Sequence, residues 1–215
     1  MPKLAIDEYK NSRSHVAIFG GSVAYSGAAR LSAKACFAAR AGLVSLYCDP
    51  DVYRLAACES PSVMVKIYEG QSIPAYGALL VGPGWGPGRE SLLEKLFATG
   101  QNIVLDADGI RAYASLLACG RRPQHGPLIL TPHLGELSFL LSSLYGDDHD
   151  RTSPNAFFES IQRAAADLNA TLVVKSSLVH IVDKAESVVV IEGNNPSLGV
   201  AGSGEREVRA DAGVE

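Results

Sequence analysis

The sequence predicts an α/β protein in which parallel strands alternate with helices. The short apolar run His15-Val-Ala-Ile-Phe19 stops at two glycines, as a buried strand does. An alanine-rich segment over residues 27–40 follows, and alanine is the strongest helix former. Gly42 ends this helix, and Leu43-Val-Ser-Leu-Tyr47 has the composition of a second strand. Strand, helix and strand within about thirty-five residues form a βαβ unit, which requires parallel strands.

The same alternation continues along the chain. Short apolar runs predict strands over residues 78–81, 102–105, 128–130 and 171–174, and a hairpin of 180–182 with 187–191. Helices are predicted over residues 91–97, 137–144 and 154–169. Nearly every predicted strand outside the hairpin is followed by Gly, Asp, His or Lys. Because ligands bind outside the carboxyl ends of the strands in an open parallel sheet, we expect these loops to converge on one crevice.

Composition limits the class of protein. The 215 residues are 47% apolar and 20% charged, with a formal charge of −4, which is ordinary for one globular domain and argues against a nucleic-acid binder. No apolar run reaches the ~18 residues that span a membrane, and the N-terminus lacks the apolar stretch of a signal peptide. The cysteines form no CxxC pair, which predicts free thiols in a reducing, cytoplasmic compartment: Cys36, Cys48, Cys58 and Cys119.

Two glycine-rich segments follow predicted strands. The segment from Gly20 to Ala28 leads into a helix, so its backbone N–H groups could hold an anion, or it could be a tight turn that lets the helix pack closely. Gly82-Pro-Gly-Trp-Gly-Pro-Gly88 suggests a backbone that approaches a ligand closely. The alternative is a long flexible loop, against which its two prolines argue.

Charged and polar side chains follow two further strands. Asp106 and Asp108 could bind a metal, a ribose hydroxyl or a cation, or they could form the turn and cap a helix. In Thr131-Pro-His133-Leu-Gly-Glu136, the imidazole could bind a polar ligand or carry a proton, and the carboxylate could cap the next helix. A single HxxE offers too few ligands for a metal site, so none is predicted there.

Two segments near the C-terminus offer groups for a phosphate. Lys175 follows a buried strand and could bind a phosphate, or it could be a solvated lysine at a strand end. The glycine-rich turn from Gly199 to Gly204 could hold an anion with its backbone amides, and Glu205 could deprotonate a hydroxyl that attacks a phosphate. The alternative is a glycine linker before a charged tail.

Taken in order, the motifs GGSVAYSGAA, VGPGWG, LDADG, LTPHLGE, VVKSS and GSGE resemble those of the NAD(P)H-hydrate dehydratases, the carbohydrate-kinase-like C-terminal domain of the YjeF proteins within the ribokinase-like superfamily. The resemblance covers about residues 10–205. It implies a three-layer α/β/α ribokinase-like fold with a mostly parallel central sheet. It also implies that residues 1–205 form the dehydratase domain and that residues 206–215 are a short charged tail.

The resemblance implies a repair reaction on damaged nicotinamide cofactors. ADP or ATP phosphorylates the hydroxyl of hydrated NAD(P)H, called NAD(P)HX, and loss of phosphate restores NAD(P)H; Mg²⁺ accompanies the nucleotide. Glu205 stands where the family has its catalytic aspartate, in contact with the substrate. The other positions implied to bind the substrate are Ala28, Gly84, Asp106 and His133. The positions implied to bind the nucleotide are Lys175, Ser176, Ser177, Leu178, Val179 and Gly204.

Three departures from the family pattern predict weakened activity. Glu205 replaces aspartate, and an ångström of displacement at a reacting group costs about 100-fold in rate. The family continues with a small apolar helix, whereas a charged tail follows here, so we expect the C-terminal part of the fold to be missing. An apolar face left uncovered in this way would favour a homo-oligomer. The family's KGxxT becomes Lys175-Ser-Ser-Leu-Val179. The alternatives are a degenerate member that still binds nucleotide, and a small-molecule kinase of the same superfamily.

Overall fold

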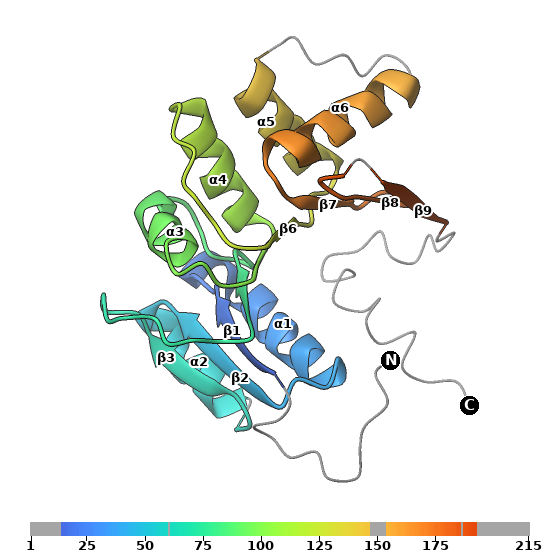
Figure 1. The fold of residues 1–215 in the computed structure, drawn as a ribbon. Helices are drawn as coiled ribbons and strands as arrows, with labels where there is room; N and C mark the ends of the chain where they lie inside the picture. Colours follow the sequence, from blue (N-terminus) through green and yellow to red (C-terminus); the bar gives the residue numbers. More distant parts are fainter. Residues whose placement is uncertain (1–13, 60, 147–153, 186, 193–215) are drawn as a thin grey trace, which may run out of the picture. The chain divides into compact units, whose positions relative to one another are not determined.

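The structure, a computed structural model, describes residues 14–59, 61–146, 154–185 and 187–192 (Figure 1). The chain divides into two compact units. The described part of the first unit ends at Gly86, and that of the second begins at Pro87. No helix in these described stretches is both long and apolar enough to cross a membrane.

The first unit holds a parallel sheet with the strand order β3-β2-β1-β4. Its strands are β1 (His15–Phe19), β2 (Leu43–Cys48), β3 (Met64–Ile67) and β4 (Ala78–Val81). Its helices are the short 3₁₀ turn η1 (Val23–Tyr25), α1 (Ser26–Ala38) and α2 (Pro50–Glu59). The predicted βαβ unit of β1, α1 and β2 is therefore confirmed.

Small residues on α1 determine how this unit packs. Ala29 and Ala33 are buried against Ile18 of β1 and against Val44 and Leu46 of β2. A methyl side chain lets a helix lie close to the sheet and costs no side-chain entropy on folding. The alanine-rich composition that predicts the helix also explains why this helix covers this face of the sheet.

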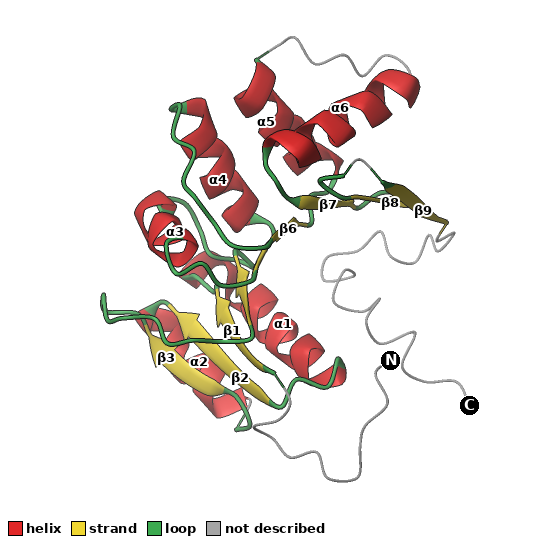
Figure 2. Cartoon of the chain, in the orientation of Figure 1, coloured by secondary structure: helices red, strands yellow, loops and turns green. Residues whose placement is uncertain are grey.

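The second unit holds strands in the order β5-β6-β7-β8-β9. Figure 2 labels β6 to β9 of this series. The first three are parallel, and β8 and β9 are each antiparallel to the strand before them. The strands are β5 (Ile103–Leu105), β6 (Leu128–Leu130), β7 (Thr171–Val174), β8 (Leu178–Val182) and β9 (Val188–Glu192). The helices are α3 (Glu90–Phe97), α4 (Asp108–Ala118), α5 (Leu134–Tyr145) and α6 (Pro154–Asp167). The predicted hairpin is thus the β8–β9 pair.

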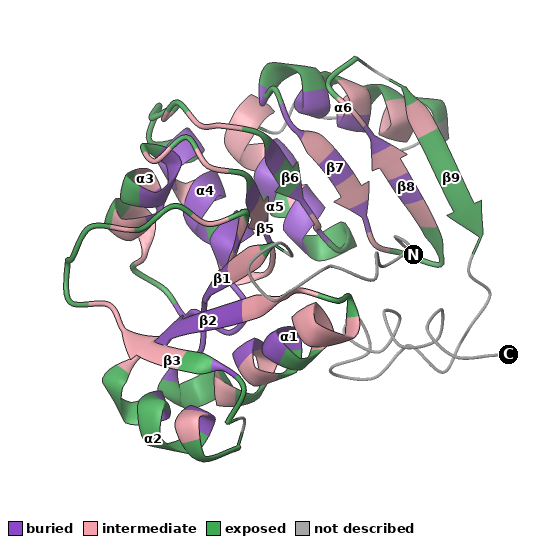
Figure 3. Cartoon of the chain, turned by 60° about the horizontal axis from the view of Figure 1, so that its bottom comes forward, coloured by how far each residue is buried: buried purple, intermediate pink, exposed green. Residues whose placement is uncertain are grey.

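Burial alternates along β6 and β7 of the second unit (Figure 3). Leu128 and Leu130 of β6 are buried, whereas Ile129 between them is exposed. Successive side chains on a strand point to opposite faces, so one face of β6 carries the core. Burial alternates in the same way along β7, where Leu172 and Val174 are the buried residues on the core face.

Four elements are absent from the sequence prediction: η1, α2, β3 and α4. The start of α4 explains one of them, because Asp108-Gly109 has the composition of a turn, and this signal hides the helix that begins there. In α2, Pro50 is the first helical residue, a position where proline is favoured because its missing N–H is not needed. These omissions leave the predicted alternation of strands and helices intact.

Candidate functional site

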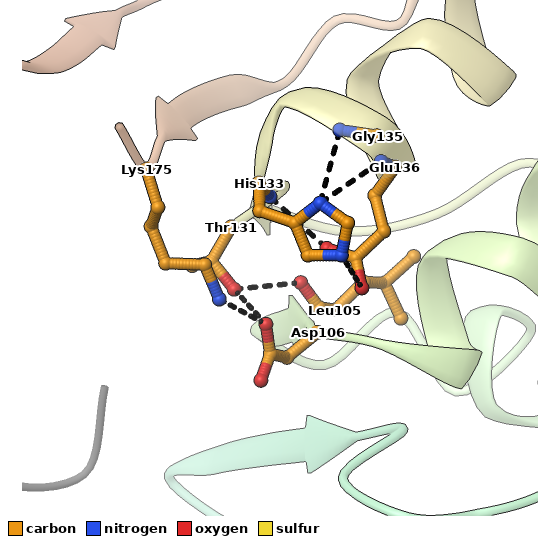
Figure 4. Close-up of polar contacts among 7 residues, drawn as sticks. All are labelled: Leu105, Asp106, Thr131, His133, Gly135, Glu136 and Lys175. Atoms are coloured by element: carbon orange, nitrogen blue, oxygen red, sulfur yellow. Dashed lines mark hydrogen bonds and ion pairs between the residues drawn. The ribbon is translucent and has the colours of Figure 1, made fainter. Parts of the chain in front are cut away.

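Three polar side chains meet at the carboxyl ends of consecutive strands in the second unit (Figure 4). Asp106 follows β5, Thr131 follows β6, and Lys175 follows β7. Lys175 Nζ lies 2.7 Å from Asp106 Oδ1, and Thr131 Oγ1 donates a hydrogen bond of 2.7 Å to the same oxygen. For these three residues, the predicted convergence of strand ends is confirmed.

The main chain fixes this arrangement, because parallel pairing continues past the ends of the strands. Thr131 N donates to Leu105 O at 3.0 Å, and Lys175 N donates to Pro132 O at 2.8 Å. His133 and Lys175 form an isolated parallel bridge. The Cα atoms that carry the polar side chains are therefore held by sheet hydrogen bonds beyond the regular strands.

The imidazole of His133 caps helix α5. His133 Nδ1 accepts hydrogen bonds from Gly135 N at 3.0 Å and from Glu136 N at 3.3 Å. In return, Glu136 Oε2 accepts from His133 N at 3.0 Å, which completes a capping box. His133 Nε2 lies 3.2 Å from Glu136 Oε1. Because Nδ1 accepts, the proton of the neutral ring lies on Nε2 and points to the carboxylate.

The two residues differ in exposure. Glu136 is buried, whereas the side chain of His133 is 54% exposed. The capping role of Glu136, left open by the sequence, is therefore confirmed. Ligand binding by His133 stays a prediction, and any ligand would meet a ring whose two nitrogens already have partners within the chain.

The segment predicted to bind nucleotide spans the turn from β7 to β8. Lys175, Ser176 and Ser177 follow β7, and Leu178 and Val179 begin β8. Ser176 Oγ accepts a hydrogen bond from Leu178 N at 3.2 Å, so this hydroxyl shapes the turn. Of this segment, the structure brings Lys175 to the polar cluster and places the others on the adjoining turn and strand.

In the first unit, the glycine-rich segment that follows β1 is hydrogen-bonded to the glycine-rich segment that follows β4. Gly21 N donates to Pro83 O at 3.0 Å, and Ser22 N donates to Gly84 O at 2.7 Å. Gly84 has a φ of 58°, and a Cβ atom added there would lie 2.3 Å from the carbonyl oxygen of Tyr25. The close packing of the two loops explains why glycine is required at this position.

The substrate-binding role of these segments is not tested by their packing. Ala28, in the first turn of α1, is half-buried. The contacts of Ala28 and Gly84 with a substrate therefore stay predictions. Gly204 and Glu205 lie outside the described residues.

The sequence patterns do not mark Thr131 or Ala107 as site residues. Thr131 is part of the TPHLGE motif, and its position directly after a predicted strand is the signal that points to it. Ala107 has φ 46° and ψ −117°, a conformation that no composition signal predicts for alanine. Within the described residues, no three His, Cys, Asp or Glu side chains are grouped as a metal site would require.

Comparison with known proteins places this geometry in a family. A family described as NAD(P)H-hydrate dehydratase matches residues 16–206. The bifunctional NAD(P)H-hydrate repair enzyme of Coxiella burnetii is 30% identical over 213 residues, which cover 95% of this chain and 41% of that protein. The ATP-dependent (S)-NAD(P)H-hydrate dehydratase of Caenorhabditis elegans is 28% identical over 197 residues, covering 85% of this chain and 63% of that protein. The chain thus spans less than two thirds of either relative.

Solved structures show the same fold. A ribokinase-like superfamily protein from Enterococcus faecalis superposes with a TM-score of 0.78 and 23% identity, covering 96% of this chain and 72% of its own. The ADP/ATP-dependent NAD(P)H-hydrate dehydratase of Bacillus subtilis, co-crystallised with ATP/Mg²⁺, gives a TM-score of 0.75 and 19% identity, with coverages of 95% and 73%. These likenesses confirm the predicted three-layer ribokinase-like α/β fold with a mostly parallel sheet. By the family match over most of its length, the chain belongs to the NAD(P)H-hydrate dehydratase family.

Proposed function

We propose that the chain catalyses the ADP- or ATP-dependent dehydration of hydrated NAD(P)H to NAD(P)H. The observation that carries this proposal is the polar cluster of Asp106, Thr131 and Lys175 at the strand ends of a chain that belongs to this family. An open α/β sheet binds its ligands at this end of the strands. A lysine held there offers a positive charge for a phosphate group.

The reaction divides into two steps with balanced atoms. The hydroxyl of the hydrated ring gives up its proton to a base and takes a phosphoryl group from the nucleotide. Phosphate then leaves with its bonding electrons while the ring loses a proton, which restores the double bond. Phosphate is a far better leaving group than hydroxide, so the nucleotide supplies the driving force for the dehydration. The protein contributes positioning and charge stabilisation, as in other phosphoryl transfers.

The family resemblance supplies the proposed roles of the residues. We assign the hydrated cofactor to Ala28, Gly84, Asp106 and His133, with Glu205 as the base. We assign the adenine nucleotide to Gly204 and to the segment of Lys175, Ser176, Ser177, Leu178 and Val179. Mg²⁺ takes most of its ligands from phosphates and water, so a site with few carboxylates fits it. Asp106 is the described carboxylate next to the proposed phosphate-binding lysine.

The direct test is recovery of the absorbance of reduced nicotinamide at 340 nm from hydrated NADH or NADPH, with ADP or ATP and Mg²⁺. We expect recovery that requires the nucleotide and is lost in Lys175→Met. Lys184→Met is the matched control, because Lys184 is an exposed lysine in the turn between β8 and β9. Recovery without nucleotide would contradict the proposed mechanism.

The same experiment separates the alternatives. Nucleotide binding by calorimetry without recovery at 340 nm would identify a degenerate member that binds but does not react. Transfer of a phosphoryl group from the nucleotide to an added vitamin or sugar alcohol, without recovery at 340 nm from hydrated NADH, would identify a small-molecule kinase.

We also propose that the protein acts in the cytoplasm as a homo-oligomer. The four free cysteines support a reducing compartment. Half-exposed apolar side chains on β9 support association, namely Val189, Val190 and Ile191. Light scattering after size exclusion tests this, and a monomeric mass at micromolar concentration would contradict it.

A further inference from the structure

Thr131 has a position in the second unit that no assigned role explains. Its hydroxyl has two acceptors within reach: Leu105 O at 3.3 Å and Asp106 Oδ1 at 2.7 Å. A hydroxyl has one proton to donate, and the shorter contact to a charged acceptor is the stronger bond. Thr131 therefore fixes the orientation of the Asp106 carboxylate.

The carboxylate oxygen that accepts the hydrogen bond from Thr131 also accepts one from the ammonium group of Lys175. Both donors lie 2.7 Å from Asp106 Oδ1. The main chains beneath the three side chains are joined by the hydrogen bonds from Thr131 N to Leu105 O and from Lys175 N to Pro132 O. With the backbone and the carboxylate both fixed, the position of the ammonium is fixed as well.

The turn after Asp106 is built in a conformation that L-residues rarely adopt. Ala107, at φ 46° and ψ −117°, lies outside the ordinary left-handed region. Arg40 and Asn169 also have positive φ, but they follow the ends of α1 and α6, where a left-handed residue is common. Ala107 instead precedes a helix, and Gly109 N donates to Asp106 O at 2.9 Å. Backbone strain of this kind is found where a side chain must be held in one place.

The ion pair is poorly explained as a source of stability. The side chains of Lys175 and Asp106 are 37% and 27% exposed. Ion pairs open to solvent contribute little to folding, because hydration competes with the pairing. What such a pair does supply is restriction of a long, flexible side chain to one position, which is of use when that side chain must meet a ligand.

We infer that Thr131 and Asp106 are positioning residues, which hold the Lys175 ammonium in place for the phosphate groups of the nucleotide. The inference rests on the proposed function for the identity of the ligand. Thr131 thereby gains a role as the residue that orients Asp106. Asp106 gains a second role, which is to hold Lys175 in addition to any contact with the hydrated cofactor.

The test follows the Lys175 amine itself. An acetylating reagent reacts with this amine when its nitrogen leaves the carboxylate, and mass spectrometry of the peptide measures the rate. We expect Asp106→Asn to speed the reaction about three- to fivefold, the range for a solvent-exposed ion pair. Thr131→Val should give about twofold, and Thr131→Ser, which keeps the hydroxyl, should match the wild type. Thr99→Val is the matched control, because Thr99 Oγ1 donates to Leu96 O instead.

Steady-state kinetics and binding complete the test. We expect Thr131→Val to raise the KM for the nucleotide about fivefold, with rescue in Thr131→Ser. ATP should slow acetylation of Lys175 in the wild type, at concentrations about fivefold higher in Asp106→Asn. Melting temperatures of the variants show whether each is folded.

The outcomes separate the two proposals. Acetylation rates of Lys175 in Asp106→Asn and Thr131→Val equal to the wild-type rate would overturn the positioning role, even if absorbance at 340 nm recovers. Rates and ATP protection that change as expected, without any recovery at 340 nm, would support the positioning role and reject the dehydratase.

Discussion

At the scale of single residues, His133 shows how one side chain limits its own chemistry. Helix N-termini are usually capped by serine, threonine, aspartate or asparagine. Here the imidazole does this through Nδ1, and Glu136 returns a hydrogen bond to the backbone N–H of His133. Any ligand of His133 would therefore compete with the helix cap for the same ring nitrogens. A substitution at His133 that keeps the helix cap but removes the imidazole ring can separate capping from ligand binding.

His133→Asn and His133→Ala form such a pair. Asparagine is among the best N-caps, so His133→Asn should retain about 1 kcal/mol of unfolding free energy that His133→Ala loses. Denaturant unfolding measures the difference. If the ring also contacts the hydrated cofactor, both variants should raise the KM for hydrated NADPH equally. Equal stability of the two variants would show that the cap contributes nothing.

The same residue explains a difference between the predicted and the observed start of a helix. The sequence predicts the helix from residue 137, whereas α5 begins at Leu134. Histidine is not a recognised N-cap, and Gly135 in the first turn resembles a loop residue. The helical turn before residue 137 depends on hydrogen bonds between side chains and backbone, which periodicity does not report.

At the scale of elements, strands were the most predictable feature of the chain. Each predicted strand lies within two residues of an observed one at both ends. A buried parallel strand is an unbroken apolar run with sharp ends, so its signal is local. The helices α2 and α4 lacked such a signal, because their starts contain Pro50 and Gly109. Only the surrounding packing turns these residues into helix starts.

The first strand places a titratable group against the sheet. His15 Nε2 lies 3.0 Å from Ser45 Oγ of β2, and the ring contacts Tyr76 edge-on with centroids 4.7 Å apart. Burial lowers the pKa of His15 below its usual value of 6.5, and the charge of Lys66 on β3 lowers it further. Both causes act against the protonated form. The folded state therefore binds a proton at His15 less readily than the unfolded state.

This difference in pKa gives the free energy of unfolding a pH dependence of known sign. Below about pH 6.5 the unfolded chain takes up a proton that the folded chain refuses, so stability falls as the pH drops through that value and is fully present above it. We expect His15→Gln to remove this contribution. Denaturant unfolding of both proteins between pH 7.5 and about pH 5 measures it. A stability difference between them that stays constant with pH would contradict the assignment.

At the scale of the whole molecule, the site was predictable in part. The strand-end rule identified Asp106 and Lys175 from one sequence, because it depends only on where strands stop. It did not identify their mutual contact at 2.7 Å, which depends on the order of strands in the sheet. It also missed Thr131, because threonine after a strand is common and becomes informative only beside a carboxylate.

The four cysteines report on the folding of both units. Cys36 and Cys48 lie in the first unit, where burial raises the pKa of each thiol to about 11. Cys58 of the first unit and Cys119 of the second are exposed. Because the thiolate is the reactive form, protonation protects both the half-buried Cys36 and the buried Cys48, and burial also limits access to Cys48.

We therefore expect two thiols to react with iodoacetamide at pH 8 in the native protein, at Cys58 and Cys119, and all four to react in denaturant. Mass spectrometry assigns the modified positions. Labelling during a denaturant titration adds a second measurement, because Cys48 becomes reactive only when the packing of β2 against α1 and α2 is lost. Modification of Cys48 in the native state would contradict the packing of the first unit. Protection of Cys119 would instead indicate that a partner or a second copy covers the end of α4, a result that bears directly on the proposed homo-oligomer.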